Sequence, residues 1–160
     1  MYASPLENNK KIMWEELHKL AEDTHGPWLV AGDFNDIAHI EEKRGGVKAS
    51  MSRCTRFRNS LQMCKLTDLE ARGPKFTWRG PVFHGGQRIY EKLDRAVSND
   101  EWRLLFPEAF VKVLMRVEFS DHHPIIINLK EDKHVKYHRP FRFENAWLLN
   151  ETYDSMLHES

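Results

Sequence analysis

The sequence predicts a single domain of the α/β class, built from layered helices and strands. Amphipathic helical segments alternate along the chain with short apolar runs that are typical of strands, and no internal repeat is present. The chain has 160 residues, of which 41% are hydrophobic, so one domain can bury a substantial core. Residues 1–130 are expected to form this domain.

An amphipathic helix and a strand are predicted in the first part of the chain. Apolar side chains recur at helical spacing over residues 10–22, and the His-Gly-Pro sequence at 25–27 ends the pattern. The nearly continuous apolar run at 28–31 is typical of a strand that is buried on both faces. This strand ends at the Gly-Asp-Phe-Asn sequence of residues 32–35.

A basic helix and a hairpin are predicted next. From Ser52 to near Leu69, apolar residues at helical spacing are interspersed with arginines and lysines, which indicates a basic amphipathic helix. Residues 75–79 and 88–97 have the pattern of strands, and the glycines and proline between them predict a hairpin with a long, basic tip.

Short elements complete the predicted domain. One of the three polar residues at 98–100 can cap a short helix, which Pro107 ends. Two strands follow at 110–117 and 125–129, separated by a polar segment. The chain then becomes polar and charged, so residues 131–160 are interpreted as a tail or linker.

Charge is distributed unevenly along the chain, although the formal net charge is zero. Residues 43–95 carry 13 basic and 4 acidic side chains, a balance of +9, whereas residues 1–42 carry 3 and 9. This middle segment forms either a solvated surface of mixed charge or a patch that faces a polyanion.

Cysteine usage and hydropathy predict a soluble protein of a reducing, intracellular compartment. The two cysteines, Cys54 and Cys64, do not have the spacing of a redox or metal motif. No apolar run is long enough to cross a membrane, so no membrane partner is expected.

Polar side chains at the ends of predicted strands are candidates for chemistry. Asp33 and Asn35 lie two residues apart, so their side chains point the same way if the extended conformation continues. A turn or a helix cap is the alternative for this pair. Asp121 and His122 occupy a short segment between two strands, where a hydrated loop tip is the alternative.

Asp94 differs from these residues because it lies among strand-forming residues, where a carboxylate usually needs a partner. An ion pair with Arg95 or Lys92 is the simplest interpretation. Cleavage of a phosphodiester, by contrast, needs an aligned water, a cation near the phosphoryl oxygens and a group near the leaving oxygen. Carboxylate, imidazole and amide groups at strand ends can meet these needs.

Four motifs occur in a definite order along the chain. They are Gly32-Asp33-Phe34-Asn35, Phe76-Thr77-Trp78, Leu93-Asp94-Arg95 and Ser120-Asp121-His122-His123-Pro124. In this order they resemble the endonuclease/exonuclease/phosphatase family, which includes DNase I and the abasic-site endonucleases. Together with Pro140-Phe141-Arg142-Phe143-Glu144-Asn145, they are similar to the endonuclease of plant non-LTR (LINE-type) retroelements and the start of its downstream linker.

This resemblance implies a DNase I-like fold, in which two facing sheets form a sandwich flanked by helices, with only the C-terminal part of that domain present. It implies a DNA-nicking endonuclease that hydrolyses phosphodiester bonds with Mg²⁺ or Mn²⁺. DNA is the implied partner and the nucleus the implied location. Fusion to a reverse transcriptase is implied for the full-length element, and no obligate protein partner is evident.

The resemblance also implies roles for the candidate residues. Asp33 would orient or deprotonate the attacking water, and Asn35 would hold the reacting phosphate. His122 would contact the phosphoryl oxygen that develops charge, with its tautomer held by Asp94. Asp121 would be a carboxylate on the metal side.

Further contacts with the substrate are implied for the N-terminus and the hairpin. Tyr2 is similar to the family's tyrosine that contacts the scissile phosphate. Arg79, His84, Gln87 and Arg88 fall where the retroelement endonucleases carry a loop that probes the DNA groove, consistent with the basic middle segment. The alternative is that this hairpin is only a polar surface turn.

The chain departs from the family pattern at its N-terminus. Full-length relatives begin with strands that supply an asparagine and a glutamate to the metal site, and neither has a counterpart here. Mg²⁺ would lack much of its oxygen shell, so low activity is expected from this chain alone. A non-catalytic nucleic-acid-binding remnant, a phosphatase for small phosphoesters and a zinc site at His134 and His138 are the alternatives.

Overall fold

The computed structural model describes residues 1–83 and 85–130. These residues form three α-helices, one 3-10 turn and three small sheets, which confirms the predicted mixed α/β class. The elements in chain order are α1 (Glu7–Asp23), β1 (Leu29–Asp33), η1 (Ile40–Glu42), β2 (Lys43–Arg44), α2 (Met51–Met63), β3 (Thr67–Asp68), β4 (Ala71–Arg72), β5 (Trp78–Val82), β6 (Arg88–Glu91), β7 (Asp94–Ser98), α3 (Asp100–Leu105), β8 (Phe110–Val113) and β9 (Ile125–Asn128). The predicted linker at 131–160 lies outside the described residues.

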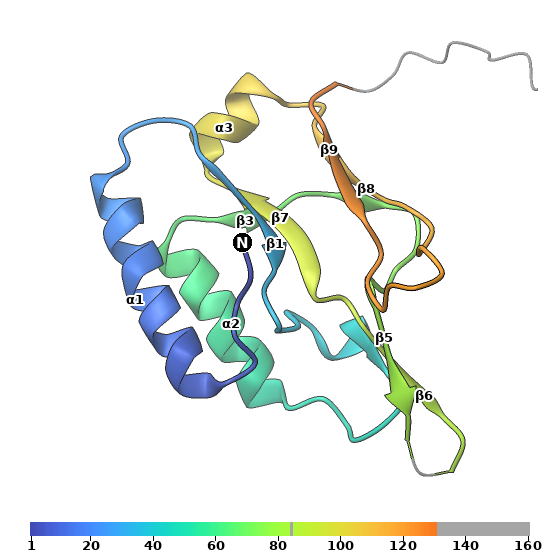
Figure 1. The fold of residues 1–160 in the computed structure, drawn as a ribbon. Helices are drawn as coiled ribbons and strands as arrows, with labels where there is room; N and C mark the ends of the chain where they lie inside the picture. Colours follow the sequence, from blue (N-terminus) through green and yellow to red (C-terminus); the bar gives the residue numbers. More distant parts are fainter. Residues whose placement is uncertain (84, 131–160) are drawn as a thin grey trace, which may run out of the picture.

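Helices α1 and α2 pack side by side against one face of the sheet with strand order β1-β7-β3 (Figure 1). Aromatic rings fill the space between these layers. The ring of Phe34 lies 6.1 Å from that of Trp14 on α1 and 5.7 Å from that of Phe57 on α2. Such contacts add stability beyond the burial of apolar area, so the residue between Asp33 and Asn35 is anchored in the core.

A second core lies between the β1-β7-β3 sheet and the β4-β8-β9 sheet. Its buried members come from both sheets, from α3 and from the residues next to these strands, namely Leu69, Ala96, Trp102, Ala109, Val111 and Val113. Strand β1 contributes to both cores, since Val30 packs against the first while Leu29 and Ala31 pack against the second. The predicted packing of this strand on both faces is confirmed, although its side chains are only partly buried.

The third sheet has the strand order β2-β6-β5 and lies at one end of the molecule (Figure 1). Its strands β5 and β6 form the predicted hairpin. The predicted strand 88–97 is instead two strands, because β6 pairs with β5 and β2 whereas β7 pairs with β1 and β3. The chain changes sheet where the Thr77 hydroxyl accepts hydrogen bonds from the backbone N–H groups of Leu93 and Asp94, at 2.9 and 2.8 Å. This change of sheet places Asp94 at the start of a strand.

Helix α2 ends earlier than predicted, at Met63 rather than near Leu69. Lys65 adopts a positive φ of 54°, and the N–H of Leu66 donates to the carbonyl of Leu61 at 2.9 Å. A left-handed residue just beyond the last turn is a common way for a helix to stop. The predicted short helix α3 is confirmed, and Asn99 is its cap, accepting from the N–H of Trp102 at 3.1 Å.

The first three residues lie alongside β1 in parallel. The N–H of Asp33 donates to the carbonyl of Met1 at 3.1 Å, and the N–H of Ala3 donates to the carbonyl of Asp33 at 2.7 Å. This approach requires a glycine at position 32, where φ is +142° and an added Cβ would lie 2.0 Å from the Met1 carbonyl oxygen. The segment thus brings Tyr2 next to the end of β1.

Gly32→Ala is expected to lower the free energy of unfolding by about 1–3 kcal/mol more than Gly26→Ala, because only position 32 forces an atomic overlap. Gly26 is a matched control, since its φ is +146° and nothing lies within 4 Å of an added Cβ. Urea unfolding of both variants measures the difference. Equal losses would show that the N-terminal segment does not hold its place beside β1.

A buried arginine links β7 to the neighbouring elements. Arg95 is 1% exposed, and its guanidinium donates to Glu42 Oε2 at 2.8 Å and to Asp68 Oδ2 at 2.7 Å. Lys92 reaches the same two carboxylates, at 3.7 and 3.0 Å. Both cations that could have neutralised Asp94 are therefore engaged elsewhere.

Candidate active site

The register of the central sheet brings two carboxylates together. Asp33 is the last residue of β1 and Asp94 the first of β7, and they are direct partners in the antiparallel pairing. Residues opposite each other in such a pair project on the same face. The side chains of Asp33 and Asp94 are 11% and 14% exposed, so two like charges share a poorly hydrated place.

An imidazole lies between these carboxylates. His122 Nδ1 is 2.8 Å from Asp94 Oδ2, and its Nε2 is 4.0 Å from Asp33 Oδ2. The prediction that Asp94 pairs with the His122 ring is confirmed, and the alternative pairing with Arg95 or Lys92 is excluded by their contacts with Glu42 and Asp68.

Backbone contacts hold the segment that carries His122 against β5. The N–H of Arg79 donates to the carbonyl of Asp121 at 2.8 Å, and the N–H of His123 donates to the carbonyl of Thr77 at 2.7 Å. The segment between β8 and β9 thus adds to the edge of β5, which fixes the position of the imidazole. It is not the freely hydrated loop tip of the alternative interpretation.

Residues distant in sequence surround one small pocket of about 320 Å³. Its lining residues are Tyr2, Asp33, Asn35, Arg53, Trp78, Ile89, Glu91, Leu93, Asp121 and His122. Asp94 completes the group through its bond to His122. The structure therefore brings together all the residues predicted to be catalytic, together with Asp121 and Tyr2.

Asp33 has the electrostatic setting of a base. Its burial raises the pKa of the carboxyl above the ordinary value, and the charge of Asp94 adds to this effect. The hydrogen bond from the Asn35 N–H and the nearby His122 act in the opposite direction but do not cancel it. A carboxylate that binds a proton more readily than usual is suited to take one from water.

The side-chain amide of Asn35 is held by two hydrogen bonds. Its Nδ2 donates to Asp33 Oδ2 at 3.0 Å and to the carbonyl of Ala3 at 2.7 Å, so both amide hydrogens are engaged. The cause is a left-handed backbone, with φ of 48°, which turns the side chain back toward β1. The predicted contact of Asn35 with the phosphate stays a prediction, and in the structure the amide contacts the Asp33 carboxylate.

Asp121 was predicted to be a carboxylate on the metal side, and this role stays a prediction. It is exposed, and its Oδ2 accepts a hydrogen bond from Trp78 Nε1 at 3.0 Å. This bond holds the pKa of Asp121 below its ordinary value. Among residues 1–83 and 85–130, no three His, Cys, Asp or Glu side chains form a group that could hold a metal ion. The described residues therefore do not make a complete Mg²⁺ site, which needs an octahedral shell of oxygens.

The other predicted substrate contacts fall in different places. Tyr2 is 70% exposed and lines the pocket. Arg79 and Arg88 do not line it: Arg79 is paired with Tyr90 across the hairpin, and Arg88 Nη1 donates to the carbonyl of Gly80 at 2.9 Å. A groove-reading role for these two arginines stays a prediction, and His84 lies outside the described residues.

Trp78 and Arg53 are pocket residues that were not predicted from the sequence to act there. An added Cβ at Gly80 would lie 2.3 Å from the Trp78 ring, so the glycine two residues on allows the indole to lie flat along β5. This spacing is a sequence signal that could have been used. Arg53 has no such signal, because its place depends on how α2 packs.

Part of the positive charge of residues 43–95 is engaged in ion pairs. At least six of the 13 basic side chains in this segment form ion pairs, namely those of Lys43, Arg53, Arg56, Arg72, Lys92 and Arg95. Three of the partner carboxylates, those of Glu7, Asp36 and Glu42, lie outside residues 43–95, so their charges lower the local balance from +9 to +6. The segment is in part the solvated, mixed surface of the alternative interpretation.

Asp94→Ala is expected to change the tautomer of His122. With Asp94 present, the neutral ring keeps its hydrogen on Nδ1, which donates to the carboxylate. Without it, the hydrogen is expected to move largely to Nε2, as in free imidazole side chains. Long-range ¹H–¹⁵N spectra, recorded at a pH where the ring is neutral, report this change.

His123 is an internal control for this measurement. Its Nδ1 is 2.8 Å from the carbonyl of Leu114, which can only accept, so its tautomer should be the same in both proteins. An unchanged His122 tautomer in Asp94→Ala would show that the carboxylate does not orient the ring.

Comparison with known proteins assigns no family. No family model matches the sequence, and no curated protein matches it significantly. One similar solved structure is that of beta toxin from Staphylococcus aureus, with a TM-score of 0.49, 17% identity and coverage of 77% of this chain. The chain spans 46% of the length of that structure. In the described part of the chain, no helix is long and apolar enough to span a membrane.

Proposed function

We propose that this chain is a phosphodiester hydrolase with the DNase I-like arrangement of the endonuclease/exonuclease/phosphatase family. The observation that carries the proposal is the geometry of His122, whose Nδ1 lies 2.8 Å from Asp94 while its Nε2 is turned toward Asp33 at 4.0 Å. Acid–base catalysis needs such an ordered series, with a base, an imidazole and a group that orients the imidazole. The layered packing of two sheets beneath α1 and α2 supports the proposed fold.

The proposed chemistry assigns one step to each side chain. Asp33, with its raised pKa, accepts a proton from the attacking water, and Asn35 keeps the carboxylate in place through two hydrogen bonds. As the water oxygen bonds to phosphorus, the bond from phosphorus to the leaving oxygen breaks. His122, protonated at Nε2 from solvent, donates toward the phosphoryl oxygen that gains charge, and the leaving oxygen takes its proton from solvent. Asp94 keeps the ring oriented throughout.

The finer proposal is a DNA-nicking endonuclease of the plant retroelement type that uses Mg²⁺ or Mn²⁺. Its support is the order of the sequence motifs and the hairpin beside the pocket. Asp121 would hold the metal ion, which would stabilise charge on the phosphate when bound. The side chains assigned above do not supply this charge stabilisation themselves, so cleavage is expected to require the ion.

Nicking of supercoiled plasmid DNA tests the proposal. The 160-residue chain is expected to nick slowly with Mg²⁺ or Mn²⁺ and not at all with EDTA. Equal nicking with and without EDTA would contradict the metal requirement. Absence of nicking with salt-dependent DNA binding would support a non-catalytic remnant, and hydrolysis of small phosphoesters without nicking would support a phosphatase.

A further inference from the structure

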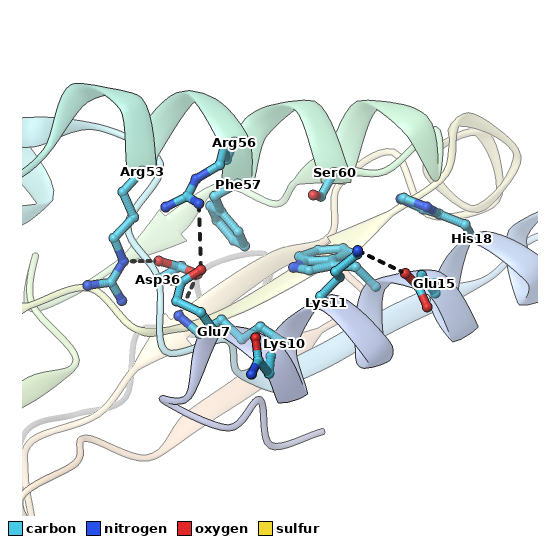
Figure 2. Close-up of a pocket in the computed structure, with 12 residues that line it drawn as sticks. Glu7, Lys10, Lys11, Glu15, His18, Asp36, Arg53, Arg56, Phe57 and Ser60 are labelled. Carbon is cyan, nitrogen blue, oxygen red and sulfur yellow. Dashed lines mark hydrogen bonds and ion pairs between the residues drawn. The ribbon is translucent and has the colours of Figure 1, made fainter.

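Arg53 lies between two hollows of the molecular surface. One is the candidate active-site pocket, and the other is a groove of about 510 Å³ between α1 and α2. Figure 2 shows this groove, with Arg53 extending from α2 to the Asp36 carboxylate. Asp36 follows the Asp33-Phe34-Asn35 sequence directly, so the same loop serves both hollows.

The pocket needs a cation if it is to hold a phosphate. Its lining includes the carboxylates of Asp33, Glu91 and Asp121, and Arg53 is the one permanently charged cation in that lining. Stabilising a phosphate requires donors or positive charge aimed at its oxygens. In the structure both amide hydrogens of Asn35 are directed at protein oxygens.

Arg53 has donors to spare. Its Nε donates to Asp36 Oδ1 and one Nη2 hydrogen to the carbonyl of Asn35 at 2.6 Å. A guanidinium has five N–H donors, so three remain, including both on Nη1. The side chain is 42% exposed and lines the pocket, so part of it is accessible to a ligand there.

A buried ion pair holds the arginine in place. Lys10 of α1 is 3% exposed, and its Nζ donates to Asp36 Oδ2 at 2.6 Å and to the Asn35 carbonyl at 2.8 Å. Lys10 and Arg53 thus donate to the same backbone carbonyl, that of Asn35, whose backbone is left-handed. The cluster of Lys10, Asp36 and Arg53 carries a net charge of +1.

From these contacts we infer that Arg53 binds a phosphate group of the substrate, and that Asp36 and Lys10 position it. The ligand class rests on the proposed phosphodiester chemistry. The inference adds a binding residue to the site and makes α1 part of the active-site architecture. It also gives the Asn35 backbone a role, as the point where the ligand-binding cation and the base-orienting side chain are tied together.

Titration of the chain with inorganic phosphate, followed by NMR through the amide signals of Asn35 and Asp36, tests the inference. Arg53→Met is expected to weaken phosphate binding by about tenfold or more, as for loss of a charge-assisted pair of hydrogen bonds. Arg53→Lys keeps the charge but not the bidentate geometry of the guanidinium. Its affinity for phosphate should lie between those of the natural chain and Arg53→Met. Arg56→Met is the matched control, because Arg56 lies on the same helix, pairs with Glu7 and lines only the groove.

Saturable binding in the natural chain that is lost in Arg53→Met and kept in Arg56→Met supports the inference. No saturable shift in the natural chain, or a dissociation constant in Arg53→Met within twofold of the natural value, overturns it. If Arg53→Met does not fold, Arg53→Lys is used instead, and a dissociation constant within twofold of the natural value again overturns the inference.

The result is separable from that of the proposed function. Phosphate binding through Arg53 without any plasmid nicking would leave the inference standing and overturn the nuclease. Plasmid nicking by Arg53→Met with an unchanged KM would support the nuclease function and overturn the inference about Arg53.

Discussion

Asp33→Asn is expected to slow phosphodiester cleavage by about 10²–10⁴-fold, the usual contribution of a positioned base. The amide has the size of the carboxylate and can still contact Asn35, but it cannot accept a proton from water. Single-turnover plasmid nicking with excess protein measures the loss. Asp23→Asn is the control, because it removes the same charge from an exposed place at the end of α1.

The same substitution is expected to make the folded chain more stable at neutral pH. The pKa of Asp33 is raised on folding, so its charged form is disfavoured in the folded state. Below pH 3.8, Asp33 is protonated in both states and does not affect the free energy of unfolding. As pH rises through the raised pKa, its ionisation destabilises the folded state. A variant that is both inactive and destabilised would point to lost structure, and an active Asp33→Asn chain would remove Asp33 from the mechanism.

Arg95→Met is expected to lower the free energy of unfolding by about 3–5 kcal/mol, because it removes the buried cation from Glu42 and leaves only the more distant Lys92, at 3.7 Å. The Arg95 side chain has no exposure, and that of Glu42 is 11% exposed. Arg95 also lies over the Phe57 ring, 5.0 Å from its centroid, so packing is lost with the charge. Urea unfolding at neutral pH measures the change.

The loss of stability of the natural chain in acid should report the same interaction between Arg95 and Glu42. Burial opposes ionisation of Glu42, but the charge and hydrogen bonds of Arg95 outweigh it and hold the pKa of Glu42 below its ordinary value of 4.5. The stabilisation is therefore fully present above pH 4.5 and is lost as pH falls through the lowered pKa. Arg95→Met should lack this component of acid destabilisation.

Lys19→Ala is the control for Arg95→Met. Lys19 also forms an ion pair, with Glu16 at 2.7 Å, but both side chains are more than half exposed. Exposed pairs contribute little because water and salt screen them, so stability should hardly change. A similarly small effect for Arg95→Met would mean that the cluster relaxes or admits water.

The sequence was most informative where a chemical group follows a clear structural period. The apolar run before Asp33 predicts a strand, and its end predicts where the carboxylate lies. Asp94 could be singled out because a charge among strand-forming residues needs a partner, and that partner is His122. The predicted strand containing Asp94 was nevertheless too long, since periodicity does not reveal the change of sheet at Thr77.

Other features depend on contacts that no local pattern encodes. Strands β2, β3 and β4 have two residues each, too few to show an alternation. The engagement of the Asn35 amide follows from its backbone conformation and from the position of Ala3. In the sequence, Arg53 is one of several arginines in a basic helix. Its ion pair with Asp36 depends on how α2 packs in the fold.

The direct pairing of Asp33 with Asp94 makes the site sensitive to strand slippage. If β7 moved by one residue along β1, Leu93 or Arg95 would come to lie opposite Asp33, and alternate side chains would exchange faces. The acidic pair would be lost, and the buried guanidinium would leave Glu42 and Asp68. A one-residue deletion within β1 or β7 should thus remove the site and the core together, so neither strand can change length without loss of both.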